Sequence, residues 1–273
     1  MRKIAVSLSP RKSAFGPLLF SGDLELGLRA ASSLGFDCVE LSLLDSERID
    51  QRWLVATLSE LSLSVSAIAT GQTYYTDGYS LFHAEAQARV NCVKRIKDHI
   101  KLAERLGCGV IIGGIRGVVA NTGDGRAKQE RDGKDALREC ALYARERAVT
   151  LLIEPVNRYE TNIVNTMAEG LSLISEIGLE NLSLLPDTFH MNIEEPDMEQ
   201  VIVSAGAAVG YVHFADSNRL APGWGHINFP GILASLASIG YQGTIGVEVL
   251  PKPDDLSAAR QAITYLRGLA EHS

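Results

Sequence analysis

Eight short apolar runs alternate along the chain with longer segments of helical periodicity. This alternation is typical of a parallel sheet whose strands are connected by covering helices. Eight strand-helix units in about 250 residues fit a (β/α)8 TIM barrel, an α/β fold in which the active site is built at the carboxyl ends of the strands. The runs are KIAVSLS, CVELSLL, SVSAIAT, GVIIGGI, TLLIEPV, LSLLPDT, VGYVHFA and TIGVEVL.

Two connecting segments show clear helical patterns. Residues 23–35 begin with a suitable N-cap, Asp23, and end at a glycine stop, Gly35. Apolar residues recur on one face between them: Leu24, Leu28, Ala31 and Leu34. Residues 90–106 carry a longer apolar stripe that ends at Gly107 and consists of Val90, Val93, Ile96, Ile100, Ala103 and Leu106.

A doubly wound open sheet is the rival fold. It would need fewer strands, and it usually carries a phosphate or dinucleotide loop after the first strand. Here SLSPRKSAFG follows the first run and contains no G-x-G-x-x-G pattern. The glycine cluster IGGIRG at 112–117 follows the fourth run and lacks that spacing, so we interpret it as close packing.

One polar, glycine-rich segment, ANTGDGRAKQERDGKD at 120–135, interrupts the pattern. Because the strand pattern resumes beyond it, we predict a loop over the barrel mouth rather than a domain boundary. The whole chain, 1–273, is therefore expected to form a single barrel domain.

The composition, 46% hydrophobic residues in 273, provides enough apolar material for a large core. No segment approaches the roughly 20 apolar residues of a membrane span, and the N-terminus lacks a cleavage pattern, so we expect a cytoplasmic protein without a membrane partner. The net charge of −7, spread without runs, disfavours nucleic acid as a partner and favours a small-molecule site. The cysteines lie far apart without a C-x-x-C pair and are expected to be reduced: Cys38, Cys92, Cys108 and Cys140.

Polar residues end four consecutive runs. Glu154 ends the fifth run, Asp187 the sixth, His213 the seventh and Glu248 the eighth. In a barrel the ends of successive strands lie side by side around the rim, so these groups can converge. Each alone has an ordinary explanation, because a strand-end carboxylate can cap the next helix and a histidine can bond a carbonyl.

Three converging carboxylates would repel one another unless a cation lay among them. The sequence therefore predicts a divalent metal held by Glu154, Asp187, His213 and Glu248. This mostly oxygen ligand set suits a hard cation. Mn²⁺ is favoured, with Mg²⁺ or Co²⁺ as alternatives.

A metal held this way can stabilise the enediolate formed when a proton is removed beside a ketone. If Glu154 and Glu248 flank the substrate, one removes a proton from one face and the other returns one to the opposite face. The result is epimerisation. Return of the proton to the neighbouring carbon gives aldose-ketose isomerisation instead.

Several stretches together resemble the xylose isomerase-like barrels of the sugar isomerase/epimerase superfamily, in particular the ketose 3-epimerase group. They are IEPVNRYETN, DTFHMNIEE, HFADSNR with GWGHINF, and VEVLP. The similarity is closest to the 5-keto-L-gluconate epimerases, because it extends to TGQTYYTDGYSL and VIIGGIRG. The resemblance covers nearly the full chain. It implies action on a free ketose or keto sugar acid and assembly as a homodimer or homotetramer.

The resemblance also implies roles for individual residues. Glu154, Asp187, His213 and Glu248 match the metal ligands, with Glu154 and Glu248 doubling as the acid/base pair. Substrate contacts are implied for Glu160, His190 and Arg219. Each has an alternative: Glu160 pairing with Arg158, His190 as a capping or core residue, and Arg219 bridging to Asp216.

Further residues lie on predicted rim loops, namely Gln72, Arg116 and His226. A guanidinium binds a carboxylate bidentately, so Arg116 is a candidate for a sugar-acid substrate, with a surface salt bridge as its alternative. Glu40 on the second strand can face the barrel interior, and its role is open. Trp224 and the pair Tyr74 and Tyr75 are candidates for pocket walls.

Three other functions compete with the epimerase. An apurinic-site endonuclease of the same superfamily would hold three zinc ions with histidines after the third and fourth strands. Here those positions are Thr70-Gly71 and Gly113-Gly114, and the acidic balance disfavours DNA. An aldose-ketose or hydroxypyruvate isomerase would use the same residues. A non-catalytic sugar-binding protein would not need the two glutamates.

Overall fold

The computed structural model describes residues 2–12 and 16–271. Eight parallel strands form one sheet in the order β6-β5-β4-β3-β2-β1-β8-β7. Isolated bridges between Leu184 and Val209 and between Asp187 and His213 join β6 to β7, so the sheet curls toward a closed barrel. The strands are β1 (Ile4–Leu8), β2 (Cys38–Ser42), β3 (Ser64–Ala69), β4 (Gly109–Ile112), β5 (Leu151–Ile153), β6 (Leu182–Leu184), β7 (Val212–Phe214) and β8 (Ile245–Val247).

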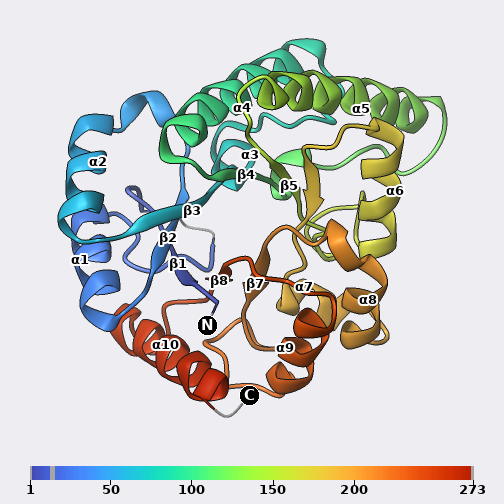
Figure 1. Cartoon of the computed structure of the whole chain (residues 1–273). Helices are drawn as coiled ribbons and strands as arrows, with labels where there is room; N and C mark the ends of the chain where they lie inside the picture. Colours follow the sequence, from blue (N-terminus) through green and yellow to red (C-terminus); the bar gives the residue numbers. More distant parts are fainter. Residues whose placement is uncertain (1, 13–15, 272–273) are drawn as a thin grey trace.

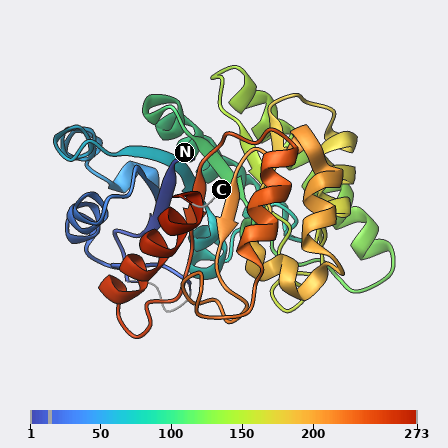
Figure 2. The ribbon, with the colours of Figure 1, turned by 60° about the horizontal axis from the view of Figure 1, so that its bottom comes forward.

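The helices form a ring around these strands (Figure 1), and Figure 2 shows α8, α9 and α10 on one outer side. Each strand of the predicted alternation is present at its apolar run, and the predicted (β/α)8 fold is confirmed. The α-helices are α1 (Leu24–Leu34), α2 (Gln51–Glu60), α3 (Gly71–Asp77), α4 (Ala86–Leu106), α5 (Asp124–Arg145), α6 (Met167–Ile177), α7 (Thr188–Glu194), α8 (Met198–Ala205), α9 (Phe229–Ser238) and α10 (Asp255–Glu271). Short 3-10 turns lie at η1 (Ser46–Arg48), η2 (Gly114–Arg116) and η3 (Gly206–Ala208).

Both predicted helices are confirmed. In α1 the Asp23 carboxylate accepts a hydrogen bond from Leu26 N, and Gly35 ends the helix at φ 86°. Helix α4 ends as predicted at Gly107, with φ 66°, but begins earlier than the apolar stripe, at Ala86. Val90, predicted on the apolar face, is 60% exposed.

The loop predicted over 120–135 is wrong for most of its length, because α5 begins at Asp124. Its polar residues are paired along the helix, with Arg126 bonded to Glu130 and Lys128 to Asp132. A Cβ on Gly133 would lie 2.3 Å from Phe82 Cδ1, so this glycine permits close packing of the helix against the chain before α4. Gly133 therefore serves packing within a helix rather than a loop.

The core has two layers. A large cluster fills the space between the strands and the helices, with Val39, Leu41 and Val110 among its fully buried residues. A small cluster lies inside the barrel below the strand ends and consists of Ala67, Ala69, Ile111, Leu152, Leu185 and Tyr211. This inner cluster forms an apolar floor beneath the polar strand ends.

All four cysteines are free thiols, in keeping with their predicted reduced state. Within the described part of the chain, no helix combines the length and apolar character that crossing a membrane requires.

His99 on α4 makes stability sensitive to acid. It is fully buried, and its Nδ1 contacts Ser46 Oγ. Burial, aided by Arg95 and opposed by Asp45 and Asp98, lowers the pKa of His99 to about 4. Because His99 binds a proton more readily in the unfolded chain than in the folded protein, acid favours unfolding. The contribution of His99 to the free energy of unfolding is therefore fully present above pH 6.5 and is lost as the pH falls toward 4.

We expect urea unfolding to show this loss directly. Between pH 7 and pH 5 the wild type should lose about 2 kcal/mol more stability than His99→Gln. Because the variant is measured beside the wild type at each pH, the effects of all other titrating groups cancel in the difference. Equal losses in both proteins would contradict the assignment.

Candidate active site

The four strand-end residues lie together. Glu154 directly follows β5, Glu248 directly follows β8, and His213 is the central residue of β7. Asp187 comes three residues after β6 and caps α7 by accepting hydrogen bonds from Phe189 N and His190 N. One ligand atom from each of the four lies within 4.8 Å of those of the other three. Asp187 thus caps a helix, as the structural alternative predicted, and also joins the cluster.

The imidazole of His213 is at the centre of this cluster. Its Nδ1 lies 3.3 Å from a Glu154 oxygen and 3.6 Å from an oxygen of each of Asp187 and Glu248. This buried nitrogen makes no hydrogen bond to any residue that the structure describes. An unbonded buried nitrogen facing three carboxylates fits a cation bound among the four residues, and so does the hard donor set.

Arg219 supplies a positive charge beside the cluster. Its Nη1 donates to both Asp187 oxygens at 2.9 and 2.7 Å, and its Nη2 bonds Glu248. Its guanidinium also lies 4.8 Å from the Phe189 ring. The alternative for Arg219, a side-chain bridge to Asp216, is wrong, because it is the backbone N of Arg219 that bonds Asp216, at its carbonyl.

The two glutamates differ in their affinity for protons. Burial raises the pKa of Glu248 to about 8, although His213 and Arg219 oppose the rise. Burial would also raise the pKa of Glu154, but the nearby His213 outweighs it and holds the pKa of Glu154 below its usual value. A bound cation would lower the pKa of both carboxyl groups. Paired carboxyl groups with separated pKa values are typical of acid/base catalysis.

His190 and Glu160 are linked through a residue that the sequence analysis did not single out. Asn157 Nδ2 donates to His190 Nδ1 and to Glu160 Oε1, each at 2.8 Å. Because Nδ1 of His190 is an acceptor here, its Nε2 carries the proton of the neutral ring. Tyr75 also donates to Glu160, at 3.2 Å. The alternative pairing of Glu160 with Arg158 is wrong, since Arg158 bonds Glu194 instead.

Most of these groups line one cavity of about 420 Å³ at the barrel mouth, namely Tyr75, Glu154, Glu160, His190, His213, Arg219 and Glu248. Gln72 lies there in the first turn of α3, not on a loop as predicted, and donates to Ser9 Oγ and Ser42 O. Apolar side chains complete the walls, and the sequence analysis had not selected them because apolar rim residues resemble ordinary core. They are Pro17, Leu18, Ile111, Val156, Phe189 and Leu250.

The other predicted rim residues divide. Tyr75 lines the cavity, whereas Tyr74 and Trp224 lie outside its lining residues. His226 also lies outside it, with its Nδ1 2.9 Å from Ser217 Oγ. Glu40 faces the barrel interior, as expected, and lies behind His213.

Arg116 lies elsewhere than predicted. Its side chain is fully buried and bonds the carbonyls of Ile112 and Val164. It therefore neither faces the cavity nor forms a surface salt bridge. The 3-10 turn η2 directs it inward, which a rim-loop pattern cannot reveal. Burial lowers the pKa of Arg116 to about 10, and Glu154 opposes the shift.

The glycine cluster after β4 makes room for the site. A Cβ on Gly113 would lie 2.0 Å from Glu154 Oε2, and one on Gly114 would lie 2.8 Å from the Tyr75 hydroxyl. The predicted close packing at IGGIRG is confirmed. The missing side chain at Gly113 allows the carboxylate of Glu154, a candidate catalytic residue, to lie against the backbone.

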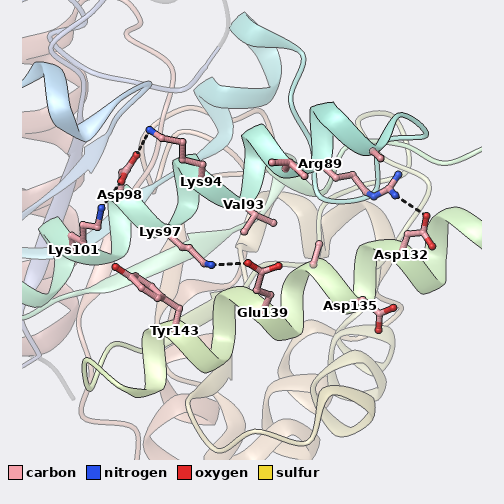
Figure 3. A pocket seen from close by; sticks show the side chains of 13 residues that line it. Arg89, Val93, Lys94, Lys97, Asp98, Lys101, Asp132, Asp135, Glu139 and Tyr143 are labelled. Carbon is pink, nitrogen blue, oxygen red and sulfur yellow. Dashed lines mark hydrogen bonds and ion pairs between the residues drawn. The ribbon is translucent and has the colours of Figure 1, made fainter.

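A larger cavity of about 670 Å³ lies between α4 and α5 on the outside of the barrel (Figure 3). Ion pairs cross it from Lys97 to Glu139 and from Arg89 to Asp132. It is remote from the strand ends, so we place the functional site in the smaller cavity.

The model of the family described as the xylose isomerase-like TIM barrel matches residues 28–269. The chain belongs to this family. The family and fold expected from the sequence are thus confirmed. The finer resemblance to 5-keto-L-gluconate epimerases stays a prediction.

Relatives within the xylose isomerase-like family are similar over most of the chain. An L-ribulose 3-epimerase of Methylomonas sp. (strain DH-1) is 32% identical over 247 residues, which cover 88% of this chain and 85% of that protein. An L-ribulose 3-epimerase of Mesorhizobium japonicum is 34% identical over 233 residues, covering 83% and 75%. A solved structure of an L-ribulose 3-epimerase superposes with a TM-score of 0.82 at 28% identity, covering 100% of this chain and 95% of that one. This member of the xylose isomerase-like family is an enzyme of the isomerase class.

Proposed function

We propose that this chain is a metal-dependent sugar epimerase that inverts the carbon next to the carbonyl of a free ketose. The observation that carries the proposal is the cluster of His213 with three carboxylates at the barrel mouth. The similarity to L-ribulose 3-epimerases supports the same activity.

Glu154, Asp187, His213 and Glu248 would hold the divalent cation, with Mn²⁺ favoured over Mg²⁺ and Co²⁺. Such a cation would polarise the substrate carbonyl and offset the negative charge that develops when the neighbouring carbon loses its proton.

Glu154 and Glu248 would move the proton. They follow β5 and β8, which have four other strands between them in the sheet order, so their carboxylates approach a substrate from different sides. One removes the proton from the carbon beside the carbonyl, leaving a cis-enediolate of the sugar. The other donates a proton to the opposite face, which inverts the configuration. In the reverse reaction the roles exchange.

Other residues of the cavity would orient the sugar. The Nε2–H of His190 and the guanidinium of Arg219 are donors for its oxygens, and Glu160 is an acceptor. The apolar wall formed by Leu18, Phe189 and Leu250 would exclude water from the reacting carbon. Gln72 is a further polar group that lines the cavity.

The cavity favours a free ketose over a keto sugar acid. Arg116, a candidate partner for a substrate carboxylate, is buried away from it. Arg219 lines the cavity but is engaged by Asp187 and Glu248. A substrate carboxylate would therefore compete with two carboxylates of the protein for one guanidinium.

Metal removal tests the proposal. We expect dialysis against a chelator to lower turnover of L-ribulose, D-psicose, D-fructose, D-tagatose or 5-ketogluconate by at least about 100-fold, because loss of the cation removes several kcal/mol of charge stabilisation. Addition of Mn²⁺ should restore it. Chromatography of the products separates a 3-epimer from an aldose, and thus epimerase from aldose-ketose or hydroxypyruvate-type isomerase. Undiminished turnover by metal-free protein would overturn the proposal.

The assembly and location stay predictions. The homodimer or homotetramer and the cytoplasmic address expected from the sequence belong to the same proposal, and sedimentation of the purified protein tests the first of them.

A further inference from the structure

A chain of buried hydrogen bonds lies behind His213. Its Nε2 is 2.7 Å from Glu40 Oε2, and the other oxygen of Glu40 accepts a hydrogen bond from Ser7 Oγ, also at 2.7 Å. Glu40 and Ser7 are fully buried, and His213 is 1% exposed. A buried carboxylate needs such partners, and Glu40 has one on each oxygen.

The chain connects separate parts of the barrel. Glu40 lies on β2 and His213 on β7, and β1 and β8 stand between these strands in the sheet. Ser7 on β1 is the register partner of Glu40. The bond from Glu40 to His213 therefore crosses the barrel interior. It joins two strands that are not neighbours in the sheet.

Packing fixes the imidazole in the same orientation. A Cβ on Gly246 would lie 2.9 Å from His213 Cδ2, so the ring lies directly against the β8 backbone. The Tyr211 ring meets it edge to face, with centroids 5.5 Å apart. With Nε2 committed to Glu40, the lone pair of the neutral ring is on Nδ1, the atom that faces Glu154, Asp187 and Glu248.

We propose that Glu40 is a positioning residue that selects the tautomer and the orientation of His213, so that Nδ1 is presented to the cation; the inference rests on the proposed metal site. What matters in this proposal is that the Glu40 side chain is long enough for its carboxylate to bond Nε2 of His213. A carboxylate placed behind a ligating histidine in this way commonly governs metal affinity by about 10- to 100-fold.

Two substitutions separate reach from charge. Glu40→Asp keeps the charge but withdraws the carboxylate by about one C–C bond, roughly 1.5 Å. Glu40→Gln keeps the length, and its amide can accept from His213 and donate to Ser7. Positioning predicts that Mn²⁺ binding, measured by calorimetry on metal-free protein, weakens about 10- to 100-fold in Glu40→Asp and less in Glu40→Gln.

Leu41→Val is the matched control. Leu41 follows Glu40 on the same strand, is fully buried, and belongs to the outer core layer. It should lower the melting temperature without changing Mn²⁺ affinity. Spin-echo spectroscopy of bound Mn²⁺ gives a second readout: the coupling to a coordinated nitrogen seen in the wild type should be lost or altered in Glu40→Asp.

The outcomes are distinct. Wild-type affinity in Glu40→Asp with weakened binding in Glu40→Gln would show a charge effect and overturn the inference, and so would equal affinity in all variants. If Glu40→Asp does not fold, Ser7→Ala replaces it, and unchanged Mn²⁺ affinity and nitrogen coupling there would likewise overturn the inference. Failure of the wild type itself to bind Mn²⁺ would instead refute the proposed function.

Discussion

Replacing Glu154 or Glu248 with glutamine should lower turnover by about 10³- to 10⁴-fold, near the upper range for loss of a general acid or base. Glutamine retains an oxygen donor and nearly the same shape, but it cannot accept or deliver the proton. Both side chains line the cavity and neighbour His213. The loss should therefore appear in kcat at saturating ketose, with the fold intact by circular dichroism.

Glu139→Gln is the control for this pair. Its carboxylate pairs with Lys97 in the groove between α4 and α5, outside the barrel (Figure 3). The turnover of Glu139→Gln should stay within about twofold of the wild type, as for surface substitutions generally. Retention of most of the turnover in both Glu154→Gln and Glu248→Gln would contradict their role in proton transfer.

Gly113→Ala should lower turnover by about 100-fold, although it adds a single methyl group outside the reacting set. That Cβ would lie 2.0 Å from Glu154 Oε2, so the carboxylate has to move. A displacement of about 1 Å in a catalytic group costs rates of this order. Steady-state kinetics should show the change in kcat, and a crystal structure of the variant should show Glu154 displaced.

Gly125→Ala provides the comparison. Gly125 lies in the first turn of α5, and its added Cβ would meet only Ala120 Cβ, at 4.0 Å. Turnover should be unchanged. Equal turnover of Gly113→Ala and the wild type would show that the backbone approach at Gly113 has no part in placing Glu154.

The barrel was predictable because each of its eight strands is an apolar run bounded by polar or glycine-containing segments, and this pattern needs no knowledge of partners. Helix α5 was not. Its pairs Arg126–Glu130 and Lys128–Asp132 stabilise a polar helix, and Gly133 is explained only by Phe82, about 50 residues away. The polar, glycine-containing composition of this segment is therefore typical of a loop, although the segment folds as a helix.

The residues of the site likewise fall into those that the sequence could predict and those that it could not. Glu154, Asp187, His213 and Glu248 could be selected because a barrel brings strand ends together. Asn157, which joins His190 to Glu160, could not be selected, because its role depends on side-chain distances across the rim. Arg116 was placed wrongly because the turn of η2, rather than the strand pattern, decides its direction.

Proton exchange tests the central claim most directly. Metal-loaded enzyme is incubated in D2O with a free ketose, and NMR follows the hydrogen on the carbon beside the ketone, with and without chelator and with Glu154→Gln as control. The proposed mechanism predicts deuterium incorporation at that carbon with inversion of its configuration, lost with chelator and in Glu154→Gln. Interconversion of the sugars without deuterium incorporation, or no exchange with any ketose alongside metal-dependent nicking of abasic DNA, would contradict it.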